Sequence, residues 1–272
     1  MAGEVKPLTP LFTHGSREDA TDRPLAGETA VAMSYGGSTH AVMMATPADL
    51  VDFACGFSLT EGIIRDCGEI EDVDVVPLDK GIDVQITLRA DRSEALAARR
   101  RSMAGPVGCG LCGLESIEAA VRDVPKVAAP DFRLRDDEVN AAVDGLSRAQ
   151  PLFAATRAVH GAGFYRPGHG MMAVREDVGR HNALDKLIGA LSREGVDAGE
   201  GAIVVSSRLS VEMVQKAAIA GSPVLIAISA PTALAVTTAE AAGLTLIATA
   251  RGDGFSVYTH SDRIVMAGRN EG

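Results

Sequence analysis

The sequence predicts an α/β protein, and three observations lead to that prediction. The chain has 272 residues, enough for one large domain or two modest ones with a substantial core. Hydrophobic residues make up 46 % of it but aromatic residues only 4 %, so small and branched side chains dominate the apolar content. In the second half, apolar runs of strand length alternate with stretches of helical periodicity, which is typical of βαβ units.

The first part of the chain predicts a small α+β domain over residues 25–105, preceded by a flexible, proline-bearing arm at 1–24. Gly36-Gly37 separates two strand-like runs and predicts a hairpin. Thr46 and Pro47 resemble a helix start, with Thr46 as the cap and Pro47 at the first helical position. The strands and the second helix expected here cover residues 29–35, 40–45, 73–77, 83–88 and 92–103.

Residues 136–272 predict a larger α/β domain, joined to the first by a loop and linker at 106–135. Its strand-like runs are apolar and flanked by helices, which predicts a largely parallel sheet covered on both faces. The expected strands cover residues 156–160, 171–174, 202–206, 224–229 and 244–250. The expected helices cover residues 136–147, 182–191, 210–220 and 233–242.

Charge and targeting features exclude several classes of function. Lys and Arg total 26 against 36 Asp and Glu, so the net charge is −10, which disfavours a nucleic-acid surface. The first 24 residues carry acids and prolines and lack the apolar segment of a signal peptide. No run approaches the roughly 18 apolar residues of a membrane span. We therefore expect a cytoplasmic protein whose cysteines are reactive or metal-binding rather than disulfide-bonded.

Polar residues follow three of the expected strands at the edge where α/β sheets bind ligands. Two of these junctions also open helices, where free backbone N–H groups favour an anion. The Ser and Thr side chains at these junctions would also suit simple helix caps. The arginines at the same junctions favour an anionic ligand. The residues proposed to bind an anion here are Ser207, Arg208, Ser229, Thr232 and Arg251, with Ser206 at the first junction.

The sharpest chemical signal is the run GPVGCGLCG, which holds Cys109 and Cys112. A zinc site would need two more ligands, for which the sequence offers His160, His169 and His181. The glycine pattern also matches a dinucleotide fingerprint, but a charged helix rather than a strand precedes it. Four glycines in nine residues disfavour a buried structural pair. A reactive thiol fits best, since Arg99-Arg100-Arg101 lies just upstream; redox disulfide chemistry and sulfur relay both remain open.

A second polar cluster lies in the run REDVGRHNALDK, which starts at Arg175. Gly179 is expected to form the turn, with Asp177, Arg180 and His181 gathered at a loop where active-site groups collect. Lys186, later in the same run, is expected to lie on a solvated helix face.

Taken together, four ordered segments resemble the FdhD/NarQ family of formate dehydrogenase accessory sulfurtransferases. The likeness extends over nearly everything from about Gly27 onward. The segments are VGCGLCGLES at 107–116, REDVGRHNALDKLIG at 175–189, SSRLSVEMVQKAAIAGSPVLIAISAPTALAV at 206–236 and GLTLIATARGDGFSVYTH at 243–260.

The resemblance implies a larger domain with a cytidine-deaminase-like three-layer α/β/α fold beside the smaller α+β domain. It implies that a cysteine desulfurase passes persulfide sulfur to Cys109, with Cys112 assisting. The client would be the bis-molybdopterin guanine dinucleotide molybdenum cofactor, before its insertion into the formate dehydrogenase apoenzyme. A homodimer is also expected. The family's cofactor-contacting segment maps onto Phe255, Ser256, Val257, Tyr258, Thr259 and His260.

We expect this last segment to pass the same sheet edge as the anion-binding residues, with GDP or GMP binding as a cofactor fragment. Asp177 or Asp253 would read the guanine. Two alternatives remain: a cofactor chaperone without sulfur chemistry, and a zinc-binding deaminase-like enzyme. The second needs an HxE…PCxxC signature, but the sequence has no His-x-Glu and Cys109 follows a glycine. Because the chain lacks an evident set of four ligands, we expect no structural metal.

Overall fold

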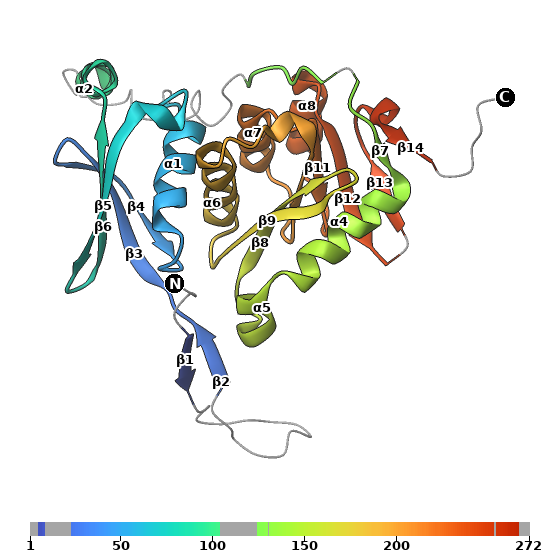
Figure 1. Cartoon of the computed structure of the whole chain (residues 1–272), viewed down its shortest axis with the longest axis horizontal. Coiled ribbons are helices and arrows are strands. Elements are labelled where there is room, and N and C mark those ends of the chain that lie inside the picture. Colours follow the sequence, from blue (N-terminus) through green and yellow to red (C-terminus); the bar gives the residue numbers. More distant parts are fainter. Residues whose placement is uncertain (1–4, 9–22, 104–123, 130, 253, 267–272) are drawn as a thin grey trace.

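The computed structural model describes residues 5–8, 23–103, 124–129, 131–252 and 254–266. Within them, two β-sheets lie on either side of a central pair of helices (Figure 1). None of the helices formed by these residues is both long enough and apolar enough to cross a bilayer.

The N-terminal sheet has the strand order β4-β3-β6-β5. Its strands are β3 (Thr29–Tyr35), β4 (Ser38–Ala45), β5 (Ile70–Leu78) and β6 (Gly81–Leu88). The predicted hairpin is confirmed, because Gly36 and Gly37 both adopt positive φ between β3 and β4. One face of the sheet packs on helix α1 (Leu50–Thr60) through residues such as Val31 and Ile86. Helix α2 (Ala90–Met103) follows β6.

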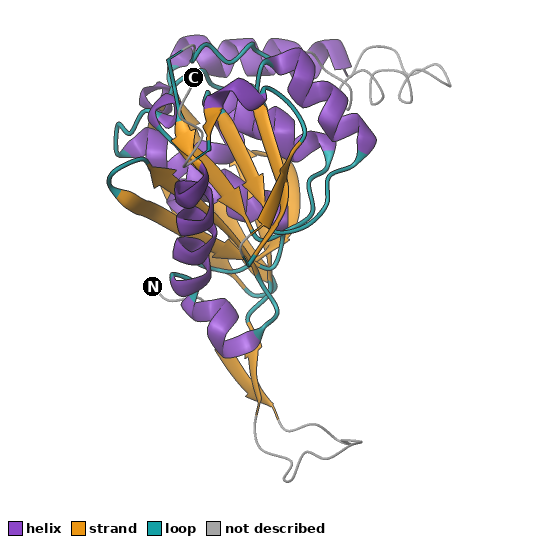
Figure 2. Cartoon of the chain, turned by 90° about the vertical axis from the view of Figure 1, so that its right-hand side faces the viewer, coloured by secondary structure: helices purple, strands orange, loops and turns teal. Residues whose placement is uncertain are grey.

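Strands β1 (Val5–Leu8) and β2 (Arg23–Ala26) pair antiparallel into a ribbon that extends away from the rest of the molecule (Figure 2). The predicted arm at 1–24 therefore contributes one strand and the start of another, and its other residues lie outside the described ranges. The domain boundaries predicted at 24, 105 and 135 stay predictions.

The C-terminal sheet has the strand order β13-β12-β11-β10-β8-β9. Only the pairings of β10 with β11 and of β11 with β12 are parallel, so the expected largely parallel sheet is mixed. The reason is that β8 joins β9, and β12 joins β13, through turns too short for a crossover. The strands are β8 (His160–Arg166), β9 (Gly170–Asp177), β10 (Ala202–Val205), β11 (Val224–Ala227), β12 (Thr245–Arg251) and β13 (Gly254–Val257).

Helices cover both faces of this sheet, which confirms the three-layer α/β/α arrangement. Along β10, Ile203 joins the core beneath α6, α7 and α8, whereas Val204 joins the core beneath α4. The helices are α4 (Asp136–Arg148), α5 (Pro151–Thr156), α6 (Arg180–Arg193), α7 (Val211–Ala220) and α8 (Ala233–Ala242). The remaining short elements are β7 (Leu134–Arg135), β14 (Ile264–Val265), η1 (Cys67–Glu69), η2 (Ala198–Glu200) and η3 (Ser261–Arg263).

Helices α1 and α6 form the joint between the two sheets, and glycines let them approach closely. A Cβ added at Gly56 of α1 would overlap the backbone of Asp185, and one at Gly189 of α6 would overlap the backbone of Asp52. Asp52 also binds Arg175 of β9 at 2.8 Å and pairs with Arg193 of α6. Backbone contact and ion pairs therefore fix the joint together.

Several expectations about local structure are wrong. Helix α1 begins at Leu50, not at Thr46, because the Thr46 backbone N–H donates to Asp177 (2.9 Å) and its hydroxyl accepts from the Val178 N–H (3.1 Å). These bonds hold Thr46 against the C-terminal unit. The strand expected at 156–160 starts only at His160, because Pro151 opens the short helix α5.

Two side-chain expectations also fail. Lys186 is fully buried rather than solvated, since it faces α1 across the joint. Cys55 and Cys67 are paired as a disulfide, with their Cα atoms 5.7 Å apart, although the sequence favoured unpaired cysteines.

Candidate functional site

The edge of the C-terminal sheet where β10, β11 and β12 end gathers most of the polar residues named from sequence. Because β8 runs antiparallel to β10, it starts at this edge, and β9 returns to it. We call this edge the rim and define it as residues 160–161, 177–181, 206–210, 229–232 and 251. Rims of this kind are where open α/β sheets bind ligands.

Backbone hydrogen bonds hold the loops of the rim together. The Leu209 N–H donates to the Ala230 carbonyl at 3.3 Å, and the Thr232 N–H donates to the Leu209 carbonyl at 3.0 Å. The Thr249 N–H of β12 donates to the Ser229 carbonyl at 3.1 Å. The loops after β10 and β11 are therefore held to each other and to Thr249, near the end of β12.

The two helices at the rim start within one residue of the expected positions, α7 at Val211 and α8 at Ala233. The residues directly before them are Ser210 and Thr232, so Ser206 and Ser229 lie in the loops that lead to the helices. The Thr232 hydroxyl accepts from the Ala235 N–H at 3.2 Å, so the plain capping interpretation holds for Thr232.

The cationic side chains of the rim are accessible. Arg251 is exposed, and its Nε donates to the Ile228 carbonyl at 3.1 Å. Arg208 is also exposed, and its guanidinium has no hydrogen bond or ion pair to another residue in the described ranges. Ser207 is buried, and its hydroxyl donates to the Arg208 carbonyl at 3.0 Å, which supports the loop rather than facing solvent.

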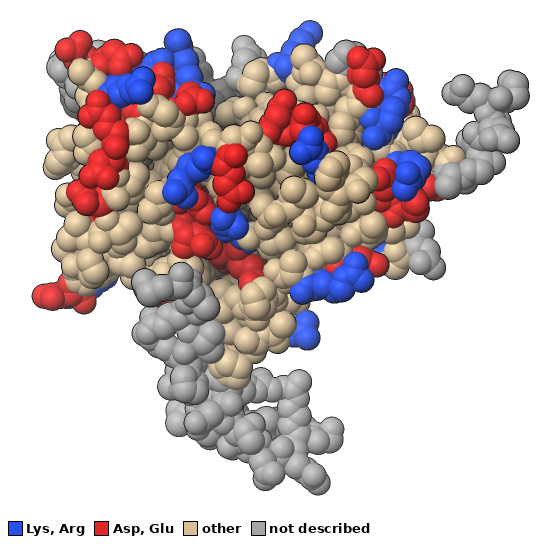
Figure 3. All heavy atoms as spheres, in the orientation of Figure 1, with Lys and Arg blue, Asp and Glu red and all other residues tan. Residues whose placement is uncertain are grey.

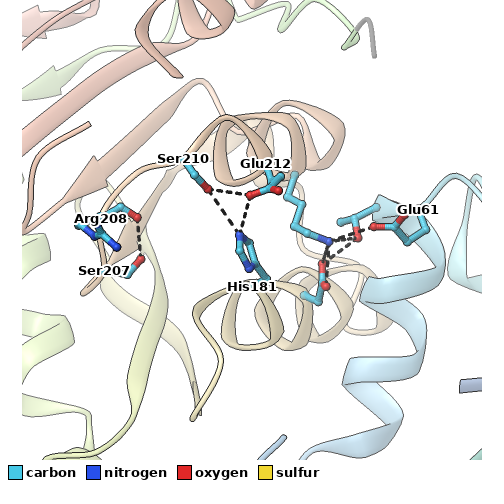
Figure 4. Close-up of polar contacts among 9 residues, drawn as sticks. Glu61, His181, Ser207, Arg208, Ser210 and Glu212 are labelled. Atoms are coloured by element: carbon cyan, nitrogen blue, oxygen red, sulfur yellow. Dashed lines mark hydrogen bonds and ion pairs between the residues drawn. The ribbon is translucent and has the colours of Figure 1, made fainter. Parts of the chain in front are cut away.

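His181 at the start of α6 reaches across to α7 (Figure 4). Its Nε2 lies 3.1 Å from Glu212 Oε2 and 3.5 Å from Ser210 Oγ, and the Ser210 hydroxyl donates to Glu212 at 3.0 Å. Burial lowers the pKa of His181 and the charge of Arg180 adds to this, while Glu212 raises it. Burial and Arg180 likewise lower the pKa of His160, so the environment of both imidazoles favours their neutral form.

Two buried donors beside the start of β8 have no acceptor among the described residues. They are Arg180 Nε and Gln150 Nε2. Gln150 lies against Gly161, where an added Cβ would overlap its side chain, and Arg180 acts electrostatically on His160. Buried donors almost always have a partner, so this corner of the rim is suited to a ligand that supplies oxygen acceptors.

Asp177 does not face the rim as a free acceptor. Its Oδ1 accepts from the Gly179 N–H (2.7 Å) and Asn182 Nδ2 (2.9 Å), and its Oδ2 accepts from Lys186 Nζ (2.6 Å) and the Thr46 N–H. Because the Asp177 carboxylate is fully buried and both of its oxygens accept hydrogen bonds, it stabilises the turn from β9 to α6.

The structure does not bring all of Phe255–His260 to the rim, as the sequence analysis expected. Strand β13 pairs antiparallel with β12, so the chain runs away from the rim after Gly254. Thr259 is buried at the other end, where its hydroxyl donates to the Leu244 carbonyl at 2.6 Å. His260 lies 3.0 Å from the Glu240 carbonyl near the end of α8.

Within this segment the side chains alternate between two environments. Phe255 and Val257 pack on the core beneath α4. Ser256 and Tyr258 are exposed, and the hydroxyl of Ser256 lies 3.2 Å from that of Thr249. The alternation places Ser256 and Tyr258 on the side of the strand that also carries α8.

Three named residues lie outside the described ranges: Cys109, Cys112 and Asp253. The side chains of Arg99–Arg101 also lie outside them. In the part of the chain that the structure covers, no three His, Cys, Asp or Glu side chains gather as a metal site. The expectation of no structural metal stays a prediction.

Sequence reasoning missed Gln150, Ser210 and Glu212 as parts of this site, and it named His160 only as a possible zinc ligand. The only available signal was for Ser210 and Glu212, because a Ser before a helix with an acid in the first turn is typical of a helix start. His160 lies at the rim, with Gln150 beside it against Gly161, only through the antiparallel placement of β8, which the sequence analysis did not foresee.

Comparison with known proteins gives a consistent picture. The family model described as the FdhD/NarQ family matches residues 26–265. The chain is 60 % identical to the sulfur carrier protein FdhD of Agrobacterium fabrum over 245 residues, covering 90 % of each chain. It is 50 % identical to the protein of the same name from Xanthomonas campestris over 250 residues, covering 92 % of this chain and 89 % of that one.

A solved structure is also similar to this chain over nearly its whole length. The crystal structure of a formate dehydrogenase accessory protein from Desulfotalea psychrophila matches with a TM-score of 0.73 at 25 % identity, covering 97 % of this chain and 99 % of that one. The family match includes both the double-cysteine run and every segment of the rim. The chain therefore belongs to the FdhD/NarQ family.

Proposed function

We propose that this protein is a sulfur carrier for formate dehydrogenase. It accepts persulfide sulfur on Cys109 from a cysteine desulfurase and passes it to the bis-molybdopterin guanine dinucleotide cofactor before the apoenzyme takes that cofactor up. The names of the relatives support the carrier role. The glycine-rich Cys109–Cys112 run supports a thiol that a second protein can approach.

The sulfur-loading step is an exchange between a thiolate and a persulfide. The Cys109 thiolate attacks the outer sulfur of the donor persulfide, a new S–S bond forms on Cys109, and the donor cysteine leaves as a thiolate. In the release step, the Cys112 thiolate attacks Cys109 Sγ. A Cys109–Cys112 disulfide forms and the outer sulfur leaves at the oxidation level of sulfide. A cellular thiol then reduces the disulfide.

The cofactor is held at the rim in this proposal. The observation that carries it is that Arg180 Nε and Gln150 Nε2 are buried donors without an acceptor in the described part of the chain. The cofactor has two pyrophosphates, while the chain has a net charge of −10. On the face drawn in Figure 3, charges of both signs are interspersed, so no broad positive field attracts an anion there. Local donors must do so, and Arg208 and Arg251 offer planar forks suited to phosphate.

Strand β13 extends this site beyond the rim. Ser256 and Tyr258 form an exposed strip on the outer strand of the sheet, and it begins beside Arg251. A ligand with two nucleotide arms is long enough to contact the rim at one end and this strip at the other. Tyr258 offers an aromatic face for a purine.

Formate dehydrogenase maturation tests the proposal. In cells that lack their own copy of the protein, Cys109→Ala should give no formate dehydrogenase activity, although the variant accumulates in folded form. Cys67→Ala, which removes a cysteine outside the proposed relay, should support normal activity. Normal maturation by Cys109→Ala would exclude sulfur carriage on this residue.

A further inference from the structure

A second pair of cysteines lies far from the proposed carrier loop in the sequence. Cys55 belongs to α1 and is only 2 % exposed, whereas Cys67 begins η1 and is half-buried. The two are paired, and their Cα separation of 5.7 Å is typical of protein disulfides. Stable structural disulfides are rare in the reducing compartment expected for this protein, so a pair at this distance suits reversible oxidation.

The pair opens into a surface cavity of about 260 Å³. Its lining carries charges of both signs, from Arg193, Glu71 and Asp72. A peptide-like thiol compound with carboxylate and ammonium groups would find partners of opposite charge there. Cys67 is the more accessible sulfur of the two, so an incoming reagent meets it first.

We propose that Cys55 and Cys67 are a thiol–disulfide exchange site for a low-molecular-weight disulfide of the glutathione class. The Cys67 thiolate attacks one sulfur of the glutathione disulfide, and one glutathione thiolate leaves. The Cys55 thiolate then attacks Cys67 Sγ, and the second glutathione thiolate leaves. The protein loses two electrons, glutathione disulfide gains them, and the two cysteine protons pass to the released thiolates.

Oxidation of this pair restrains the joint between the two sheets. The ring it closes includes Thr60 and Glu61, which bind Lys216 Nζ of α7 at 2.9 and 3.4 Å. One turn before Cys55, Asp52 binds Arg175 and Arg193 of the C-terminal unit. The disulfide thus ties the middle of α1 to η1, with Thr60 and Glu61 inside the ring that it closes. A disulfide restricts the unfolded chain and thereby raises the free energy of unfolding.

The double variant Cys109→Ser/Cys112→Ser isolates the pair, because the chain has four cysteines. After incubation at graded ratios of glutathione disulfide to glutathione, the free thiols are counted by alkylation and intact mass. We expect two free thiols in glutathione alone and none in the disulfide, with a loss of two hydrogens and no retained adduct. The oxidised form should unfold at a higher urea concentration than the reduced form.

Single replacements in the same background identify the entry point. Adding Cys55→Ser should trap a glutathione adduct on Cys67, whereas adding Cys67→Ser should give a several-fold slower adduct because Cys55 is buried. Two thiols that stay alkylatable in glutathione disulfide, or equal adduct rates in the two variants, would overturn the proposal. None of these measurements involves sulfur transfer, so their outcome tests the exchange site independently of the proposed carrier function.

Discussion

Lys186 Nζ donates a 2.6 Å hydrogen bond to Asp177 Oδ2, and neither side chain has any exposed surface. Lys186 also donates to the Thr46 carbonyl of the N-terminal unit at 2.8 Å. Burial lowers the pKa of Lys186, and the Asp177 carboxylate opposes that shift. One ion pair therefore connects the joint between the sheets with the turn that places Arg180 and His181 at the rim.

Removing one charge of this pair should destabilise the fold strongly. We expect Lys186→Met to lower the free energy of unfolding by about 3–5 kcal/mol, because it leaves the Asp177 carboxylate buried without its counter-charge. Urea denaturation measures this. In the control Arg135→Met, the lost ion pair with Asp137 is exposed (58 % and 61 %), so the free energy of unfolding should change much less than in Lys186→Met. Equal effects of the two variants would contradict the assigned role of Lys186.

The glycine contact between α1 and α6 gives a second prediction. In most helices Gly→Ala is stabilising by up to about 1 kcal/mol. Gly189→Ala should instead destabilise by about 1–3 kcal/mol, because the new methyl overlaps the Asp52 backbone, which cannot move alone.

Gly145→Ala in α4 is the matched control. There the added Cβ lies 3.3 Å from Cβ and Cε of Met171 rather than overlapping a backbone, so any destabilisation should be much smaller. Thermal unfolding of both variants compares them, and a stabilised Gly189→Ala protein would rule out close packing of the two helices.

The pKa of His181 gives a third test at the rim itself. NMR titration should find this pKa below its ordinary value, owing first to burial and then to Arg180. Glu212→Gln should lower it further, because the carboxylate 3.1 Å away favours the imidazolium. Glu194→Gln, at the other end of α6, removes a similar charge and should leave the pKa unchanged. A rise in Glu212→Gln would refute the pairing.

The same shift makes stability depend on pH. Since the pKa of His181 is lower in the folded protein, the unfolded chain binds more protons between that pKa and about 6.5. The free energy of unfolding should therefore fall as the pH is lowered through this window. His160 contributes in the same direction.

Guanine nucleotide binding tests the proposed cofactor site. Calorimetry should show GDP binding more tightly than ADP, and Arg208→Ala should weaken GDP binding by about 1.5–3 kcal/mol, the range for a lost charged hydrogen bond. Arg148→Ala removes an exposed arginine from α4, on the opposite face of the sheet, and should not change it. Unchanged affinity in Arg208→Ala would place the phosphate site elsewhere.

Local patterns predicted the local structure well. Gly36-Gly37 marked its hairpin because two residues of positive φ are what such a turn requires. Strand β11 and helix α8 were recognisable because turn residues bound each of them. The gathering of the loops after β10, β11 and β12 followed from the parallel order of those strands.

What failed depended on contacts between distant segments. Lys186 has the sequence context of a surface residue, and only the packing of α1 on α6 buries it. Thr46 has the features of a helix cap, but bonds to Asp177 and Val178 hold it elsewhere. Phe255–His260 was expected at the rim because the sequence does not reveal that β13 turns back along β12.

The most direct test of the central claim is detection of a persulfide on Cys109. The protein is incubated with a cysteine desulfurase and cysteine, and its peptides are weighed by mass spectrometry. We predict one added sulfur on the peptide that holds Cys109, reversible by a reducing thiol. The addition should persist in Cys112→Ala and in Cys67→Ala and be absent in Cys109→Ala. Equal sulfur loading of Cys109→Ala, or no loading of the unaltered chain, would contradict the carrier function.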